Sequence, residues 1–285
     1  MSISVHTNKS ALVALQNLNK TNDEMGTVQS HINTGLKIAN ARDNAAVWSI
    51  AQNQRADIGA LGAVKMSLDR ANSIAEVSMA AGESVSDLLV QLKEKVVAAM
   101  DTSIDTASRT ALDSEFKSIL RQIAQVTDNA AFDGANLLNG LAATGGAPSI
   151  QFLANSSASS YITLSAQDMT MAPGGTGLII TMSQGSSLDS VEVSTTILQQ
   201  LNESILNVNQ ALGSLGSQAK QIESHSEFVG KLTDTLQAGV GNLVDADLAK
   251  ESAHLQALQV QQQLGAQALS IANQAPQMIL QLFKG

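Results

Sequence analysis

The stretch from Ser252 to Phe283 reads SAHLQALQVQQQLGAQALSIANQAPQMILQLF and decides the fold. Its 32 residues include no Asp, Glu, Lys or Arg, and leucine and isoleucine recur at helical spacing among glutamines. Apolar residues that repeat every three or four positions predict a helix with an apolar face. Because an uncharged helix of this kind is poorly suited to water, we expect it to be buried against other protein.

The opening segment of the chain is built in the same way, with few charges and an apolar stripe at helical spacing. Two such segments suggest arms that pair with each other and then with neighbouring copies. One partner covers only part of each apolar side chain, whereas ordering each backbone position costs about 1–2 kcal/mol. We therefore expect both arms to be largely disordered in a free subunit and to fold on assembly. The arm residues expected at subunit interfaces are Leu12, Leu15, Leu18, Met25, Val28, Ile32, Leu248, Leu255, Leu258, Leu264, Leu269, Ile279, Leu282 and Phe283.

Composition excludes several classes of function. The chain has 285 residues and a formal net charge of −9, which argues against nucleic acid, whose phosphates need a basic face. It has no cysteine, so disulfides and cysteine-ligated metals are excluded. The C-terminal arm has a glutamine in nearly every turn, so we expect no membrane insertion. The first residues lack the regions of a signal peptide, and we expect export to use another route.

Periodicity and turn residues divide the chain into helices at residues 4–34, 44–100, 109–129, 194–237 and 245–282. Gly35 is expected to end the first helix, and Gly239 and Gly241 to mark a joint before the last. Asp133-Gly134 and Asn139-Gly140 are turn dipeptides.

Residues 141–190 differ from the rest because Gly, Ser and Thr dominate them. Short strands are expected around Ile162 and Ile179, and Gly174–Gly177 reads as a turn. The fold is therefore predicted to be mainly α: a long antiparallel coiled coil or helical bundle formed by both chain ends, with a small β-rich outer region in the middle.

The histidines form no metal site or catalytic motif in the sequence. His6, His31, His225 and His254 are far apart, and no HExxH motif is present. Glu251 and His254 share a helical face, but two ligands do not make a catalytic metal site.

Other residues that could bind a ligand or take part in catalysis have simpler expected roles. Asp245 and Asp247 fit a helix N-terminus, which favours acidic residues, better than a cation site. Trp48 lies on a periodic helix, and we expect it in the core or at a subunit contact rather than in a binding pocket. No nucleophile motif surrounds any serine. We expect no enzyme activity, no cofactor and no metal.

Three stretches resemble the bacterial flagellins. TGLKIANARDNAAVWSIAQNQRADIGAL (Thr34–Leu61) is similar to their N-terminal signature, and residues 242–283 are similar to their C-terminal signature. DNAAFDGANLLNG (Asp128–Gly140) resembles the family's turn after the second core helix. The wording NARDNAAVWSIAQ resembles the alphaproteobacterial flagellins, of the Caulobacter type.

The resemblance implies a structural subunit of the flagellar filament, which self-assembles into a helical tube for swimming. It implies an inner coiled-coil domain (1–40 with 245–285), a helical core domain (41–140 with 191–244) and an outer hairpin and loop region (141–190). It also implies secretion through the flagellar export apparatus with a chaperone, an extracellular location in the filament, and contact with hook-associated junction and cap proteins and with paralogous flagellins. The alternative within the family is a hook–filament junction protein, which shares the same arms.

Two positions of the resembling stretches need separate treatment. For Arg42 and Asp43 the resemblance favours a contact between neighbouring subunits, and a solvated pair is an equal alternative. Val90-Gln91 stands where many flagellins carry a Gln-Arg pair seen by a host innate receptor, so we do not expect that recognition here.

Flagellins of similar type often bear O-linked sugars in the middle region. We hypothesise that several hydroxyls there are glycosylated, the simpler alternative being a soluble, loop-rich surface. The candidates are Thr144, Ser156, Ser159, Thr163, Thr170, Thr176, Thr181, Ser183 and Ser186, with Ser157 and Ser160 beside them.

Overall fold

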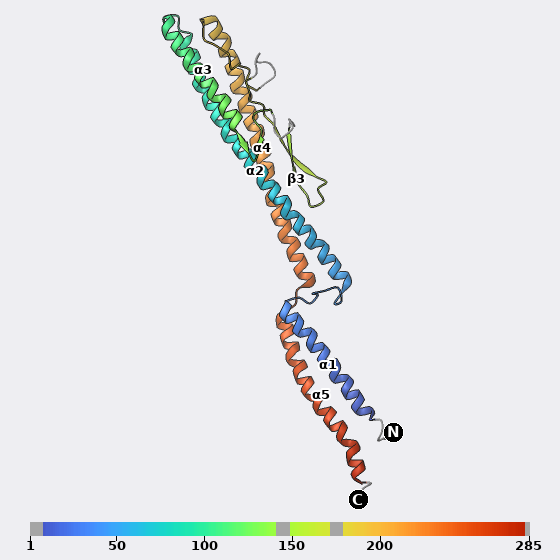
Figure 1. Cartoon of the computed structure of the whole chain (residues 1–285). Helices are drawn as coiled ribbons and strands as arrows, with labels where there is room; N and C mark the ends of the chain where they lie inside the picture. Colours follow the sequence, from blue (N-terminus) through green and yellow to red (C-terminus); the bar gives the residue numbers. More distant parts are fainter. Residues whose placement is uncertain (1–7, 141–148, 172–178, 283–285) are drawn as a thin grey trace. The chain divides into compact units, whose positions relative to one another are not determined.

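The computed structural model describes residues 8–140, 149–171 and 179–282, with side chains to Gln274. It is dominated by long helices (Figure 1), which confirms the predicted mainly α fold with a small β region in the middle. The elements are α1 (Lys9–Thr34), α2 (Ala45–Ala99), α3 (Thr106–Asn129), β1 (Ala131–Phe132), β2 (Ala135–Asn136), β3 (Ser149–Leu153), β4 (Tyr161–Ser165), α4 (Val191–Val244) and α5 (Leu248–Leu282).

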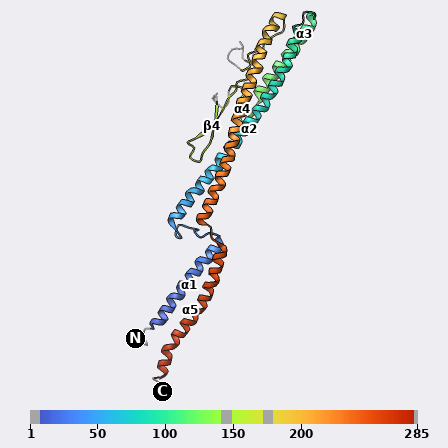
Figure 2. The ribbon, with the colours of Figure 1, turned by 180° about the vertical axis from the view of Figure 1, so that it is seen from behind.

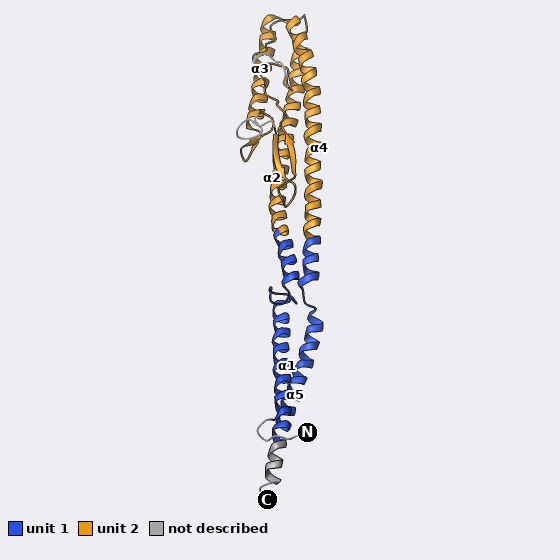
Figure 3. Cartoon of the chain, turned by 90° about the vertical axis from the view of Figure 1, so that its right-hand side faces the viewer, with its two compact units in different colours: residues 1–56, 235–285 blue, residues 57–234 orange. Residues whose placement is uncertain are grey.

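The chain divides into two compact units (Figure 3). Unit 1 contains residues 1–56 and 235–285, and unit 2 contains residues 57–234. The boundaries fall inside α2 and inside α4. Each unit is described by itself below.

Unit 2 has a continuous apolar core between helices. Its parts of α2 and α4 lie side by side with α3 in both views of the ribbon (Figures 1 and 2). Leu92 of α2, Phe116 of α3 and Ile222 of α4 are fully buried. The helices approach closely at Gly82, where an added Cβ would stand 2.7 Å from a methyl group of Leu212. The heptad-like apolar spacing of these helices is what produces this seam.

Helix α3 begins earlier than the sequence predicts. It starts at Thr106 rather than at residue 109, because the Asp105 side chain accepts a hydrogen bond from the Ser108 N–H and caps the helix. Lys95 of α2 and Glu115 of α3 form an ion pair at 2.8 Å, which holds the two helices together. The segment 100–105 between α2 and α3 is therefore shorter than the gap of 101–108 between the two predicted helices.

Two small hairpins follow α3. The β1–β2 hairpin turns at Asp133 and Gly134, whose φ angles of 49° and 77° are both positive; this confirms the Asp-Gly turn and its mechanism. Strand β4 confirms the strand predicted around Ile162. Its partner β3, which pairs with it antiparallel over Ser149–Leu153, was not predicted.

The strand predicted around Ile179 is wrong for the residues that the structure describes there. The backbone of this segment pairs with helix α4 instead of with another strand. The Thr181 N–H donates to the Ser204 hydroxyl at 3.0 Å, and the Asn207 side chain donates to the Ile179 carbonyl at 3.2 Å. Ile180 and Met182 are fully buried. Ile180 and Met182 therefore pack into the core, but their segment does not pair with another strand. Gly174–Gly177 lies outside the described residues.

Asp113 of α3 anchors the segment that leads into α4. Its carboxylate accepts hydrogen bonds from the Leu188 N–H at 2.8 Å, from the Ser187 hydroxyl at 3.0 Å and from Lys117 at 2.7 Å. Burial raises the pKa of Asp113, but these three donors together outweigh burial and lower the pKa below its usual value. The charged form therefore stabilises the folded unit.

The joint between α4 and α5 lies later than predicted. Gly239 and Gly241 are inside α4, which continues to Val244. A glycine in a helix interior costs only about 1 kcal/mol, and the burial of Val240 and Val244 offsets that cost locally. The chain breaks at residues 245–247, so the last helix begins at Leu248 rather than at Asp245.

A candidate assembly surface on the paired arms

The two arms, α1 and α5, are brought together by a short connection in unit 1. Gly35 ends α1 in the left-handed conformation, with a φ of 71°, and its N–H donates to the His31 carbonyl at 2.8 Å. This confirms the predicted C-cap. The Gly35 carbonyl then accepts from the Ala246 N–H at 2.8 Å, and the Lys37 N–H donates to the Val244 carbonyl at 2.8 Å. These bonds place the end of α1 beside the start of α5.

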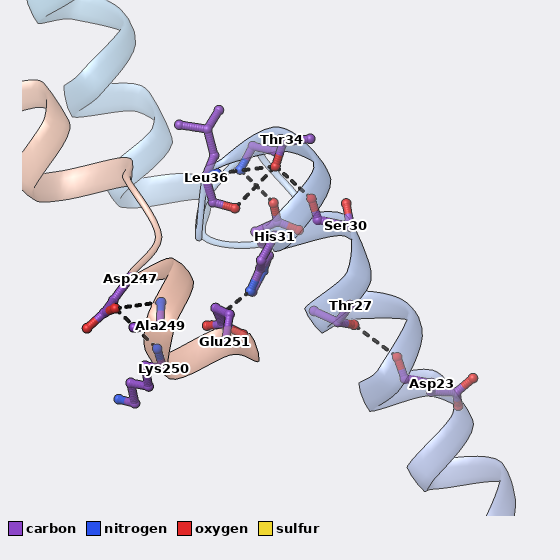
Figure 4. A network of polar contacts seen from close by, with 12 residues as sticks. Asp23, Thr27, Ser30, His31, Thr34, Leu36, Asp247, Ala249, Lys250 and Glu251 are labelled. Atoms are coloured by element: carbon purple, nitrogen blue, oxygen red, sulfur yellow. Dashed lines mark hydrogen bonds and ion pairs between the residues drawn. The ribbon is translucent and has the colours of Figure 1, made fainter. Parts of the chain in front are cut away.

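Asp247 caps α5. Its carboxylate accepts hydrogen bonds from the N–H groups of Ala249 at 3.0 Å and Lys250 at 3.2 Å (Figure 4). This agrees with the helix N-terminus that the sequence predicts at Asp245 and Asp247, and assigns the cap to the second of them.

The arms pack antiparallel along one heptad seam on each helix. The less exposed residues of α1 recur at alternating spacings of three and four, and the same holds in α5. This is the a/d pattern of a coiled coil. Val28 of α1 and Leu258 of α5 are 4% and 2% exposed. The seam positions are Ala11, Ala14, Leu18, Thr21, Met25, Val28 and Ile32 in α1, and Leu255, Leu258, Gln262, Gly265, Leu269 and Ala272 in α5.

Polar side chains set the register of the arms. The Asn8 side chain donates to the Ala272 carbonyl at 2.6 Å, and the Gln262 side chain donates to the Asn22 side chain at 2.7 Å. A specific polar pair beside an apolar seam disfavours shifted pairings, because a slip leaves its groups without partners. The glutamine-rich composition of α5 thus has a local use at Gln262.

Each arm also carries large apolar side chains outside the seam. In α5 these are Val260, Leu264 and Ile271, which are 56%, 60% and 69% exposed. At 3.6 residues per turn they lie on the side of the helix away from the seam. In α1 they are Leu12, Val13 and Leu15, which are 53%, 56% and 43% exposed. We call these six residues the outer apolar face.

A shallow groove of about 530 Å³ runs between the arms beside this face. Most of its lining is small, because Gly265, Ala268 and Ala272 of α5 face Ser10, Ala14 and the outward Val13 of α1. The Cβ that Gly265 lacks would touch Leu18 at 3.4 Å. A groove with small walls between two exposed apolar stripes fits apolar side chains of another protein surface.

The structure divides the predicted interface residues into two groups. Leu18, Met25, Val28, Ile32, Leu255, Leu258 and Leu269 lie in the seam inside one subunit, whereas Leu12, Leu15, Leu248 and Leu264 are exposed. The side chains of Ile279 and Leu282 and the whole of Phe283 lie outside the described residues. Sequence reasoning missed Val13, Val260 and Ile271. A heptad assignment of α5 places Val260 at f and Ile271 at c once the contacts with α1 have shown which positions are a and d.

Asp43 has a role that the sequence did not reveal. Its carboxylate accepts hydrogen bonds from the N–H groups of Ala39 and Asn40, at 2.9 and 3.1 Å, and so fixes the turn before α2. Arg42 and Asp43 are both exposed. Their contact with a neighbouring subunit remains a prediction. Trp48, one turn into α2, is half-buried.

The candidate glycosylation residues differ in how free their hydroxyls are. Ser159 and Thr163 are exposed on the β3–β4 hairpin, although the Ser159 hydroxyl accepts a hydrogen bond from the Asn155 side chain at 2.8 Å and bonds with the Ser157 hydroxyl at 2.9 Å. The hydroxyls of Thr170 and Thr181 donate to Asp168 at 2.6 Å and to the Gln200 carbonyl at 2.9 Å, and Ser156, Ser183 and Ser186 are half-buried. Thr144 and Thr176 lie outside the described residues.

Within the described residues, no group of three or more His, Cys, Asp or Glu is arranged to hold a metal ion. His225 Nε2 lies 2.7 Å from the Ala154 carbonyl oxygen. Glu251 approaches His31 rather than His254. None of the helices in the described part is long and apolar enough to cross a membrane.

Comparison with known proteins identifies the family. A profile described as the bacterial flagellin N-terminal helical region matches residues 5–143, and one described as the C-terminal helical region matches residues 198–283. The chain belongs to the bacterial flagellin family. It is 50% identical to "Flagellin FljJ" of Caulobacter vibrioides, with the whole of both chains covered. It is 38% identical to a flagellin of Brucella melitensis, with 99% of both covered.

The solved structure of a putative flagellar hook-associated protein from Vibrio parahaemolyticus shares the fold, with a TM-score of 0.52, 14% identity, and coverage of 71% of this chain and 100% of that one. At that identity the likeness concerns the fold alone. The full-length matches to flagellins make this flagellin a subunit of the flagellar filament. The family is one of structural proteins, and nothing favours the junction-protein alternative.

Proposed function

We propose that this flagellin polymerises by burying the outer apolar face of its paired arms against neighbouring copies. The observation that carries the proposal is the exposure of the six side chains of this face on a pair of helices that shares only one seam. Fully burying one such side chain contributes about 1.5–3 kcal/mol. The inner domain of the filament would then consist of residues 1–40 and 245–285, the surrounding helical domain of 41–140 and 191–244, and the outer region of 141–190.

Assembly would also complete the folding of the arms. Within one subunit the side chains of α5 that the structure describes, up to Gln274, are covered along one side only, and the opposite side meets water. A helix of this kind gains most of its stability from burial of its apolar faces. We therefore propose that the arms of the free subunit are largely disordered and become helical at the growing tip. Amide exchange of residues 8–34 and 248–282 should be rapid in the free subunit and slow in the filament; slow exchange in the free subunit contradicts this.

The surface itself is tested by replacing Leu264 and Ile271 with glutamine. The double variant should keep the unit 2 core, because neither residue lies in unit 2, but should fail to form sedimenting filaments. The matched control replaces Leu264 with Met and Ile271 with Leu, which keeps the face apolar and should assemble. Normal filaments from the glutamine variant would refute the proposed surface.

Several features of the family extend to this chain as proposals. We expect secretion through the flagellar export apparatus with a chaperone, incorporation outside the cell beside paralogous flagellins, and contact with hook-associated junction and cap proteins. We also expect no catalytic activity. An export block by a chain prefolded through engineered disulfides between its arms would support passage in an unfolded form.

Glycosylation of the outer region is the remaining proposal. Exposure favours Ser159 and Thr163, together with Ser157 and Ser160 in the same hairpin turn. Thr181 is disfavoured, because its hydroxyl is bonded to α4. The intact mass of native filament protein should exceed the mass of the bare chain, and peptide mapping should place sugar on the hairpin. A mass equal to that of the bare chain rules the modification out.

A further inference from the structure

The end of α1 and the start of α5 place a histidine beside a glutamate at one end of the paired arms. His31 Nδ1 lies 3.5 Å from Glu251 Oε1, and both side chains are only 18% exposed (Figure 4). The Figure shows the imidazole directed from α1 across to α5. The two residues are 220 positions apart in the chain, so any interaction between them links the two arms.

The imidazole is incompletely satisfied in this position. His31 Nδ1 is buried and makes no hydrogen bond with any described residue. A buried polar atom without a partner costs about 1–3 kcal/mol. Protonation changes this balance, because Nδ1 then carries a proton and a share of the positive charge that face the Glu251 carboxylate.

The helix ends favour these charges. His31 is in the last turn of α1 and Glu251 in the first turn of α5. The carbonyl end of a helix stabilises a cation, and the N–H end stabilises an anion. The antiparallel pairing brings these two ends together, so a protonated His31 meets a favourable field from its own helix and an opposite charge from the partner helix.

The other charged groups of the joint are turned to different partners. Lys37 donates to the Asn242 carbonyl at 3.1 Å. The Asp247 carboxylate caps α5, and the Lys250 side chain points away from His31 in Figure 4. The remaining titratable groups near the joint, all exposed to solvent, are Asp23, Glu24, Asp245 and His254.

We propose that His31 and Glu251 form an acid-sensitive clasp that tightens the pairing of the two arms when His31 is protonated. The clasp rests on the proposed function, because it acts on the arms that build the filament. Imidazoles ordinarily change charge within about pH 5–8, and the test therefore compares two pH values inside that range.

The test compares amide exchange of residues 28–36 and 246–258 at about pH 5.5 and about pH 7.5, after correction for the intrinsic rates. It uses the full chain after induction of assembly, and sedimentation scores filament formation separately. We expect protection at the acidic pH to rise about fivefold in the wild type. His31→Gln and Glu251→Gln should each remove the rise.

Two further variants complete the test. His31→Lys carries a charge at both pH values and should show high protection at both. His254→Gln, an exposed change on the same helix, should keep the wild-type rise. A rise that survives His31→Gln, or that His254→Gln removes equally well, overturns the clasp. Failure of the wild type to sediment at both pH values counts against the proposed function, whereas sedimenting wild-type filaments without a rise in protection count against the clasp alone.

Discussion

Unit 2 and the paired arms of unit 1 use similar apolar residues in opposite ways. In unit 2, α2, α3 and α4 enclose side chains such as Leu92, Phe116 and Ile222, which are fully buried. In the arms, Val28 and Leu258 are the only large side chains of α1 and α5 that are buried among the described residues. When three helices surround a core, as in unit 2, each helix buries a broad face. The two helices of the arms bury only the single seam between them.

One chain can therefore be both stable as a subunit and ready to polymerise. The stability of a core enclosed within the subunit does not depend on protein concentration, whereas the burial of a face that neighbouring subunits cover does. The part of α5 from Ser252 to Leu282 carries no charged residue, which suits the second situation, because desolvating it incurs no penalty for burying charge.

Deletion of residues 254–285 should abolish polymerisation and leave unit 2 folded. The truncated chain loses most of α5, including Leu258, and none of its unit 2 residues. Sedimentation should find no filaments, while circular dichroism and urea unfolding should retain the cooperative transition of unit 2. Filaments from this truncation would break the comparison.

Phe116→Ala should destabilise the free subunit by about 3–5 kcal/mol, because it empties a fully buried site in unit 2. Leu258→Ala also removes a buried side chain, but in the arms. It should leave the urea unfolding transition of the free subunit unchanged and raise the concentration needed for assembly. Equal losses of unfolding free energy in both variants would show that the arms fold in the free subunit.

Asp113→Asn should destabilise unit 2 by about 1–3 kcal/mol near neutral pH, because it weakens three hydrogen bonds to a mostly buried carboxylate. The folded-state pKa of Asp113 lies below its usual value. Its contribution is therefore full above the unfolded pKa and is lost as the pH falls through the folded pKa.

Urea unfolding at about pH 7 and about pH 3 checks this sign, since the gap between wild type and Asp113→Asn should narrow in acid. Asp133→Asn is the control, because the Asp133 side chain is 64% exposed in its pair with Arg70. An equal effect of the two substitutions would contradict the assigned role of Asp113.

Glu227→Gln should have the smallest effect. Hydrogen bonding to Lys231 lowers the pKa of Glu227, but the two side chains are 68% and 74% exposed, and solvent screens such pairs. We expect the unfolding midpoint to remain within measurement error at both pH values. A shift as large as that of Asp113→Asn would show that exposure is a poor guide to these ion pairs.

Local signals explain most of what could be predicted. The C-cap at Gly35, the Asp133-Gly134 turn and the extent of α2 depend on the conformational preferences of a few consecutive residues. The predictions were wrong where contacts with distant parts of the chain outweigh the local preference. Ile179 to Met182 looks like a strand by composition, but side chains of α4 satisfy its backbone. Gly239 and Gly241 look like a joint, but burial of Val240 keeps the helix intact.

The candidate surface shows the same limit. The apolar stripes of both arms are visible in the sequence, and so is the absence of charge from Ser252 to Phe283. Which of these residues lie in the seam and which lie on the outer apolar face was not predicted, because Leu264 and Leu258 are the same residue type in one continuous helix. The contacts with α1 assign one to the seam and the other to the outer apolar face.

The sequence by itself determined the helices, their main caps, the family and the two apolar arms, since each depends on local spacing or on motifs read along the chain. Only the tertiary structure decided which face of each arm is covered, where α4 ends, and that His31 meets Glu251. These depend on contacts between residues more than 200 positions apart, which no local pattern specifies.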